Sequence, residues 1–245
     1  MSHKTGPSTC FVPTFLCEAA PKMTLELSFM EEDDIPAFAV VEAAAMAGWS
    51  VARAMDMASQ GGEPRQAMVE RWACEGFQND SQQVWLKVTD TELGELVAVA
   101  LWRFELADER AGAAGSVPAR DAAVELQGQT HPVPEVMVAM GEIWEAFKSE
   151  FVGGQAFANL SILVTHSHHQ RRGAASMLVQ WGCEKADERG MVAALMATKA
   201  GVGVYLRHGF QVLNETMLDL RPYSVDASDL RIGMLRQPML REIWT

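Results

Sequence analysis

The chain has 245 residues, of which 49% are apolar, and its formal net charge is −12. This length suits one large domain, or one domain with a long insertion, and the apolar fraction allows a sizeable core. The acidic balance disfavours non-specific nucleic-acid binding, which depends on lysine and arginine side chains that meet phosphates. No run of about 18 apolar residues occurs, so we expect neither a membrane span nor a membrane partner.

The four cysteines are scattered along the chain and form no C-x-x-C pair. Sparse, unpaired cysteines in a chain of this length indicate free thiols in a reducing compartment, so we predict a cytoplasmic protein. Residues 1–24 contain a short apolar patch, but Pro13 and Glu18 interrupt it. Such a patch is a poor signal-peptide core, and we predict an N-terminal arm over 1–24.

The first elements are predicted from short patterns. Residues 25–29 alternate between apolar and polar, which is typical of a strand. The alanine-rich stretch 37–47 indicates a helix, for which Asp34 is a candidate N-cap. Two more helices are expected over 51–57 and 65–75.

The middle of the chain predicts a β-hairpin, with strands at 84–88 and 96–104 joined by a turn at 90–94. Residues 106–134 are rich in alanine, glycine, proline and charge, and they lack a sustained period. So long a stretch without a pattern is unusual inside a compact domain, so we interpret it as an insert. A helix is expected over 136–151.

The next part of the chain alternates strands with helices. We predict, in order, a strand at 159–165, a polar loop at 166–171, a helix at 173–188, a strand at 192–197 and a helix at 200–207.

Residues 209–245 show fewer patterns of regular structure. Two short strands at 209–213 and 216–220, with Asn214 and Glu215 between them, are typical of a hairpin. Residues 222–245 show little period, so we expect a C-terminal tail. The predicted organisation is therefore the arm, a domain over 25–221 that carries the insert, and the tail.

The most informative segment is the loop Gln170-Arg171-Arg172-Gly173-Ala174-Ala175, which follows a predicted strand and opens a predicted helix. The first N–H groups of a helix have no partner within the helix, and the helix dipole adds positive potential there. Small residues allow a diphosphate to approach the backbone closely, and the two arginines can add charge-assisted contacts. The segment lacks both the glycines of a dinucleotide fingerprint and the G-K-S/T of a Walker loop.

The loop fits the pattern Q/R-x-x-G-x-G/A, with Gln170, Gly173 and Ala175 at the defined positions. It resembles the pyrophosphate-binding motif of the GNAT acyltransferase superfamily, and the longer run L-x-T-H-x-x-x-Q-R-R-G-A is similar to the fungal branch. The resemblance covers residues 25–104 and 136–221. It implies an α/β GNAT fold, in which a central, mostly antiparallel mixed sheet is flanked by helices and splays apart at a groove for CoA.

The resemblance also implies acetyl-CoA as the acyl donor. The end of the strand before the loop would pair its backbone with the pantetheine arm, and the loop and first helical turn would bind the diphosphate. The residues predicted to bind the donor are Leu163, Val164, Thr165, Gln170, Arg171, Arg172, Gly173, Ala174, Ala175 and Ser176.

Tyr205 begins the segment Tyr205-Leu206-Arg207-His208-Gly209-Phe210, which resembles the late Y-x-x-x-G-F element of the family. In many members this tyrosine protonates the CoA thiolate as it leaves, and the resemblance implies that catalytic role for Tyr205. The chemistry is sound, because a phenol is a proton donor near pH 7 and a thiolate leaving group benefits from one. A tyrosine that only packs against the groove is the alternative.

No residue stands out as the general base. Glu31, Glu32, Glu142 and Glu145 are candidates, but each is also an ordinary solvated or helix-start charge. Met196 stands where relatives often place a polar or acidic residue. The sequence therefore does not define the chemistry of the acceptor side of the groove, and an altered or lost activity is an alternative.

Two further groups of residues are candidates for a functional role. The histidines at 166, 168 and 169 suggest a metal, but a metal site needs convergent ligands and no cysteine or carboxylate flanks them, so we predict none. The tryptophans that we expect first in an apolar acceptor pocket are Trp49, Trp102 and Trp144.

We therefore expect an acetyl-CoA-dependent N-acyltransferase that passes acetyl directly to an amine, because no cysteine motif suggests an acyl-enzyme. A small-molecule amine is the expected acceptor, since the 106–134 insert is long enough to close over a pocket. A protein or peptide amine is the alternative acceptor. The alternative function is a catalytically altered member that binds CoA or another ligand in the same groove, as a sensor or for different chemistry.

Overall fold

The computed structural model describes residues 24–58, 63–80, 82–107 and 134–239. The strands of this part of the chain form one sheet in the order β1-β2-β3-β4-β5-β7-β6. β4 and β5 are parallel, and every other pair of neighbours is antiparallel. The strands are β1 Leu25–Phe29, β2 Gln83–Asp90, β3 Glu95–Glu105, β4 Phe157–Thr165, β5 Val192–Ala197, β6 Gln211–Asp219 and β7 Ser228–Arg236.

The helices agree closely with the ranges that the sequence predicts. The α-helices are α1 Ile35–Met46, α2 Ser50–Ala58, α3 Arg65–Asn79, α5 Glu135–Phe147, α6 Ala174–Glu188 and α7 Val202–Arg207. Short turns of helix are η1 Glu32–Asp34, η2 Lys148–Val152, η3 Ser167–His169 and η4 Arg221–Tyr223. None of these helices is long and apolar enough to cross a membrane. The expected mixed α/β architecture is confirmed.

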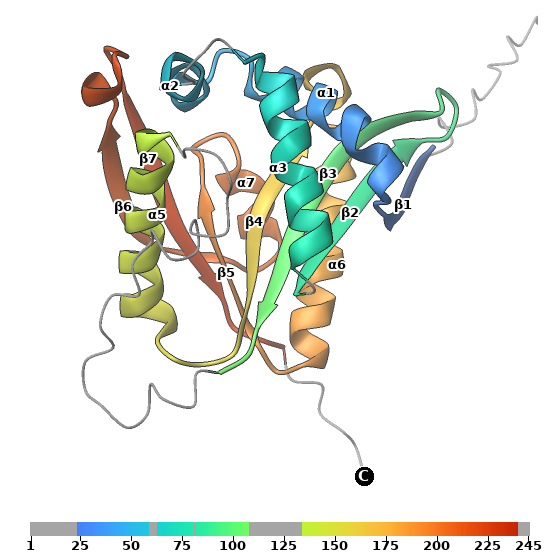
Figure 1. The fold of residues 1–245 in the computed structure, drawn as a ribbon. Coiled ribbons are helices and arrows are strands. Elements are labelled where there is room, and N and C mark those ends of the chain that lie inside the picture. The colour runs from blue at the N-terminus through green and yellow to red at the C-terminus, as the bar shows by residue number, and fades with distance from the viewer. Residues whose placement is uncertain (1–23, 59–62, 81, 108–133, 240–245) are drawn as a thin grey trace, which may run out of the picture.

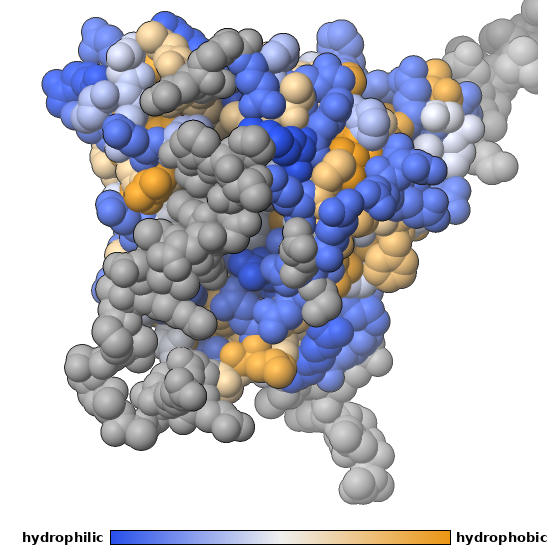
Figure 2. All heavy atoms as spheres, viewed as in Figure 1, coloured by the Kyte–Doolittle hydropathy of each residue, from blue (hydrophilic) through white to orange (hydrophobic). Residues whose placement is uncertain are grey.

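The helices cover both faces of the sheet (Figure 1). On one face, α1 and α3 pack against Trp85 and Leu101, and on the other, α6 packs against Ala100 and Trp102. Successive residues of β3 thus enter two different cores, as the period of two in a strand requires. Figure 2 shows that hydrophilic residues cover most of the α3 side of the first face, with apolar residues in small separate patches.

Helix α6 approaches the sheet closely at Gly182. The Trp102 side chain is fully buried there, and its Nε1 donates a hydrogen bond to the carbonyl oxygen of Leu178 at 3.2 Å. A Cβ at position 182 would overlap the Trp102 ring. This close contact fixes the height of α6 above the sheet, and α6 is the helix that opens at the predicted diphosphate loop.

Two expectations for the C-terminal end are wrong. The hairpin predicted over 209–213 and 216–220 is the single strand β6, whose pairing with β7 passes from Val212 to Asn214 and leaves Leu213 as a bulge. The predicted turn residues lie inside the strand because β6 has a full-length partner in β7. Taken by itself, the pair Asn214–Glu215 is typical of a turn. Pairing with β7 keeps both residues in the strand.

The other wrong expectation is that 222–245 lacks regular structure, because β7 lies in this segment and pairs with β5 on one side and β6 on the other. Asp229 and Arg231 alternate with Leu230, Ile232 and Met234, which is the period of two expected for a strand, and an ion pair joins Oδ2 and Nη1 of the two charged residues at 3.4 Å. The predicted arm lies outside the described residues except for Thr24. The insert lies outside them except for Leu106, Ala107 and Pro134.

Candidate active site

The two parallel strands at the centre of the sheet separate after a short pairing. β4 and β5 pair only where Phe157–Asn159 lies beside Val192–Ala194. Beyond that point β4 continues to Thr165 with β3 as its strand partner (Figure 1). The residues from Leu163 to Thr165 therefore have no strand neighbour on the β5 side within the described part of the chain. Amide groups of an extended ligand can pair with such an edge.

A bulge marks the start of the separation. The pairing of β3 with β4 passes from Leu160 to Ile162 and leaves Ser161 outside the register, with its side chain exposed. A bulge bends its strand and increases the local twist. Ser161 lies two residues after Asn159, the last residue of β4 that pairs with β5, so the bulge and the divergence occur next to each other. Sequence patterns give no sign of this bulge.

The loop after β4 ends in a helix N-terminus that suits an anion. Gly173 precedes α6 with φ +100°, and the N–H of Met177 donates to the Gly173 carbonyl oxygen at 3.1 Å. The N–H groups of Ala174, Ala175 and Ser176 lie ahead of that first helical hydrogen bond. They point off the N-terminus, where the helix dipole adds positive potential. A Cβ added at Gly173 would meet no atom within 4 Å, so the approach is open.

The loop backbone is fixed by two residues in the left-handed region. Arg171 has φ +64°, which is uncommon for a residue other than glycine, and Gly173 is the second. Between Thr165 and Arg171, Gln170 adopts an extended conformation, and its Nε2 donates to the Thr165 carbonyl oxygen at 3.5 Å. The three motif positions thus have distinct local structures: a side-chain link back to β4, a left-handed cap and a residue in the first helical turn.

The two arginines of the motif differ in their surroundings. Arg171 is exposed, whereas Arg172 forms an ion pair with Asp90 at 2.6 Å and contacts Nδ1 of His169 at 2.9 Å. The Arg172 guanidinium is thus held toward the end of β2. Its predicted contact with a diphosphate stays a prediction, but the ion pair also gives it a structural part in holding the loop.

The three histidines of the loop lie together. The ring centroid of His166 is 5.2 Å from that of His168 and 5.4 Å from that of His169. Burial and then the two neighbouring histidines lower the pKa of His166, which favours its neutral form. Among the described residues, no three histidine, cysteine or acidic side chains are arranged to hold a metal ion.

Tyr205 lies on α7, with its side chain buried and its ring edge-on to Phe210 at a centroid distance of 5.9 Å. The ring also lies close to the backbone at Gly201. Burial raises the pKa of the phenol, so the hydroxyl keeps its proton across the neutral range. Within the described part of the chain no group hydrogen-bonds this hydroxyl. Its predicted role as the acid in the transfer stays a prediction.

The face of the sheet opposite α6 carries polar residues that sequence reasoning missed. Nε1 of Trp49 donates to Oδ1 of Asp229 at 2.9 Å, and the guanidinium of Arg231 lies 5.6 Å from the Trp49 ring centroid. Arg231 is opposite Thr216 of β6 and one residue beyond Ile232, which pairs with Ala197 at the end of β5. The cluster of Trp49, Asp229 and Arg231 thus borders the end of β5.

The other acceptor-side candidates have varied positions. Met196 packs near Trp144, on the face that α5 covers. Trp102 belongs to the opposite core, under α6, so it does not line this face.

Of the candidate bases, three already serve local contacts. Glu31 takes part in the capping box of η1, Glu32 accepts a hydrogen bond from Gln78, and Glu145 pairs with Lys148.

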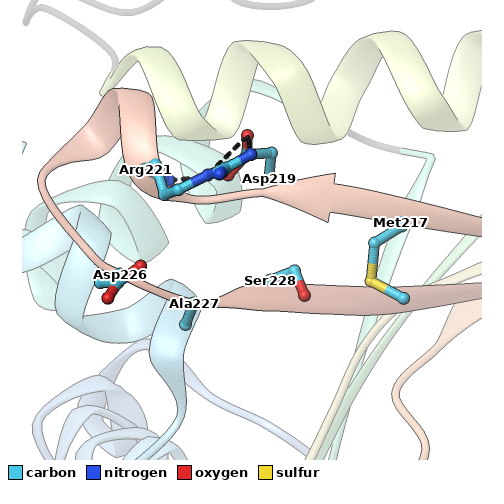
Figure 3. Close-up of a pocket in the computed structure, with 6 residues that line it drawn as sticks. All are labelled: Met217, Asp219, Arg221, Asp226, Ala227 and Ser228. Atoms are coloured by element: carbon cyan, nitrogen blue, oxygen red, sulfur yellow. Dashed lines mark hydrogen bonds and ion pairs between the residues drawn. The ribbon is translucent and has the colours of Figure 1, made fainter.

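A shallow pocket of about 430 Å³ lies at the connection between β6 and β7 (Figure 3). It is lined by Met217, Asp219, Arg221, Asp226, Ala227 and Ser228. Figure 3 shows the side chains of Asp219 and Arg221 paired with each other along the upper edge. None of the residues predicted to bind the donor lines this pocket.

Solved structures share this fold. Arylalkylamine N-acetyltransferase 2 from Aedes aegypti has a TM-score of 0.59 at 14% identity, over 87% of this chain and 98% of that one. A structure named 'histone acetyltransferase HPA2 and related acetyltransferase' from Corynebacterium glutamicum has a TM-score of 0.55 at 18% identity, over 90% of this chain and 99% of that one. A mosquito arylalkylamine N-acetyltransferase-like protein 5b has a TM-score of 0.60 at 7% identity, over 87% and 99%. At these identities the likeness shows the fold alone.

Sequence comparison gives the family. No curated protein matches the chain in sequence. The sequence model of the acetyltransferase (GNAT) family, however, matches residues 58–210, which include β4, the loop, α6 and Tyr205. The predicted resemblance is thereby confirmed. Because this match spans more than half of the chain, the protein belongs to the acetyltransferase (GNAT) family and is an acyltransferase.

Proposed function

We propose that the protein transfers the acetyl group of acetyl-CoA directly to a small-molecule amine. One observation carries the donor part of this proposal: β4 leaves β5 at the end of the sheet where α6 begins with three N–H groups ahead of its first hydrogen bond. The pantetheine arm would pair with the backbone from Leu163 to Thr165, and the diphosphate would lie at the first turn of α6. An extended amide edge next to an anion site matches the two chemical parts of CoA.

The reaction needs two proton movements. A neutral amine attacks the thioester carbonyl carbon, a C–N bond forms, and the C–S bond breaks as the tetrahedral intermediate collapses. The leaving thiolate takes the proton of Tyr205, and the attacking nitrogen loses a proton that returns, through water, to the tyrosine. Tyr205 is protonated at neutral pH, as a proton donor must be, and burial raises the pKa of its phenol, so the proton leaves only as negative charge develops on the sulfur.

The acceptor would approach from the face that carries Met196 and the cluster of Trp49, Asp229 and Arg231. Met196 and Trp144 make the end of β5 apolar, whereas the cluster supplies charge beside it. A net charge of −12 favours an acceptor that is cationic in solution. A small amine with an apolar part fits this combination. A protein or peptide amine is the alternative acceptor.

The second candidate function is a CoA-binding protein without this transferase activity. One observation favours it: the side chain at the end of β5 on the acceptor face is the thioether of Met196, which cannot act as a base. In that case the groove would bind CoA, or another ligand, as a sensor or for different chemistry.

One experiment separates these functions. The full chain is titrated with acetyl-CoA by calorimetry, and free thiol release is then followed with a panel of arylalkylamines, polyamines, amino acids and peptide N-termini. Turnover on a small amine supports the proposal. Turnover on peptides alone supports the alternative acceptor, a protein or peptide amine. Binding without turnover on any amine favours the second function. Absence of acetyl-CoA binding contradicts the assigned groove.

A further inference from the structure

A short hydrogen bond joins the first turn of α6 to the end of α7. Oγ of Ser176 lies 2.6 Å from Nε2 of His208, which follows the last residue of α7. Ser176 is the third residue of α6, so its N–H is one of the three that face the proposed diphosphate position. The sequence separates the two residues by 32 positions. The contact therefore links the first turn of α6, next to the predicted diphosphate loop, to α7, which carries Tyr205.

The backbone of His208 is held in place independently of Ser176. Its N–H donates to the carbonyl oxygen of Tyr205 at 2.9 Å, and its own carbonyl oxygen accepts from Nε of Arg236 at 2.9 Å. Arg236 in turn pairs with both carboxylate oxygens of Asp187, at 2.7 and 2.8 Å. His208 is thus fixed by β7 and α6 before any ligand binds, so its ring offers Ser176 a partner in a defined place.

The direction of this hydrogen bond decides what Ser176 can offer to a ligand. When Nε2 has no hydrogen, the serine hydroxyl must donate to it, and Oγ then has only lone pairs for other partners. When Nε2 carries a hydrogen, it donates to Oγ, and the hydroxyl hydrogen is released for another acceptor. Phosphate oxygens are acceptors, so a diphosphate at the first turn of α6 favours the second arrangement.

We propose that His208 is a positioning residue for the acyl donor: by donating from Nε2 to Oγ of Ser176, it directs the serine hydroxyl hydrogen toward the CoA diphosphate. The inference rests on the proposed donor groove and adds to it a residue outside the loop. It requires a hydrogen on Nε2, either in the neutral tautomer or in the imidazolium. A bound diphosphate stabilises both forms, and the charged one more strongly.

The charges around His208 set the pH dependence. Burial lowers the pKa of the imidazole first, followed by Arg207 on the same helix and Arg236 on β7, whose charge Asp187 of α6 partly offsets. In the free protein His208 is therefore neutral near pH 7. Binding of the anionic donor raises the pKa of His208 relative to the free protein. The affinity for acetyl-CoA then increases as the pH falls, and this gain is lost as the pH rises through the pKa of the bound state.

The test measures the dissociation constant of acetyl-CoA by calorimetry between about pH 5.5 and 8.5. It compares the wild-type protein, Ser176→Ala, His208→Leu, the double variant and His208→Gln. We expect Ser176→Ala and His208→Leu each to weaken binding about tenfold, with no further loss in the double variant, because both remove the same hydrogen bond. In turnover, the KM for acetyl-CoA rises and kcat is retained.

The glutamine variant separates positioning from simple packing. The amide of His208→Gln can donate to Ser176 but does not titrate, so it restores affinity at pH 7 and abolishes the pH dependence. Additive losses in the double variant, unchanged affinity in His208→Leu, or a wild-type pH profile in His208→Gln would each overturn the inference. Failure of the wild-type protein to bind acetyl-CoA contradicts the proposed function instead, so the two failures are distinct.

Discussion

Nη2 of Arg172 lies 2.6 Å from Oδ2 of Asp90, and this ion pair joins the loop before α6 to the last residue of β2. The other carboxylate oxygen of Asp90 accepts hydrogen bonds from Oγ1 of Thr24 and from the N–H of Glu92, both at 3.1 Å. The carboxylate is therefore oriented by Thr24, next to β1, and by the turn after β2, and it orients the arginine. The position of the loop thus depends on the β2–β3 hairpin as well as on β4 and α6.

We expect Asp90→Asn to raise the KM for acetyl-CoA several-fold and to leave kcat nearly unchanged. The substitution removes the charge that holds Arg172, so the N–H groups at the start of α6 are less well oriented before the donor binds. Steady-state kinetics at saturating amine measure the effect. Asp219→Asn is the matched control, because it also removes an aspartate–arginine pair, but one that is exposed. Equal effects of the two substitutions would contradict this role for Asp90.

The same ion pair predicts a dependence of stability on pH. The hydrogen bond from Arg172 lowers the pKa of Asp90 below its ordinary value of 3.8. A group whose pKa is lowered in the folded protein contributes stability above its unfolded pKa, and loses it as the pH falls through the folded pKa. Urea unfolding between about pH 5 and 3 should therefore show a steeper loss of unfolding free energy for the wild-type protein than for Asp90→Asn. Parallel curves would show that the pair adds no stability.

Tyr205→Phe is expected to lower kcat by about 100-fold, because it removes the proton donor for the thiolate. The KM for acetyl-CoA should change little, since the hydroxyl acts on the leaving group. Tyr223→Phe is the control, because Tyr223 is the only other tyrosine of the chain and lies in η4. An unchanged kcat in Tyr205→Phe would mean that Tyr205 only packs against the groove and does not act as the acid.

The packing of α6 gives a prediction about stability. Gly182→Ala places a methyl group where the Trp102 ring lies, so the helix or the ring must move. Overpacking of this kind costs about 1–3 kcal/mol or more in unfolding free energy. Gly203→Ala is the control within a helix, because the nearest atom to its added Cβ is the end of the Arg207 side chain at 3.8 Å. Urea unfolding of both variants at neutral pH measures the difference.

The strand, loop and helix around the predicted diphosphate site could be predicted from the sequence because their signals are local. Gln170, Gly173 and Ala175 lie within six residues, and a strand before and a helix after them are enough to give the loop its meaning. The matching family model and the divergence of β4 from β5 support that interpretation. The pairing of Arg172 with Asp90 could not be foreseen, because it joins residues 82 positions apart that only the fold brings together.

On the acceptor side, a local signal for β7 was missed and the contacts of its charged residues were out of reach. Asp229 and Arg231 alternate with Leu230, Ile232 and Met234, so the strand had a local signal, but the contacts of both charged residues with Trp49 join segments that only the fold brings together. The bulge at Ser161 likewise follows from the pairing of β3 with β4, which no local pattern encodes.

Gly173→Ala tests whether the backbone of the loop itself binds the donor. Gly173 has φ +100°, a conformation that residues with a Cβ rarely adopt, and an added Cβ there would meet no atom within 4 Å. The cost is therefore backbone strain alone, about 1–3 kcal/mol. If the loop relaxes to avoid that strain, the first N–H groups of α6 turn away, and the KM for acetyl-CoA rises at constant kcat. Gly203→Ala again serves as the control for stability, since its backbone is helical. A variant that loses stability but keeps the wild-type KM would mean that the left-handed cap supports the fold and not the binding of the donor.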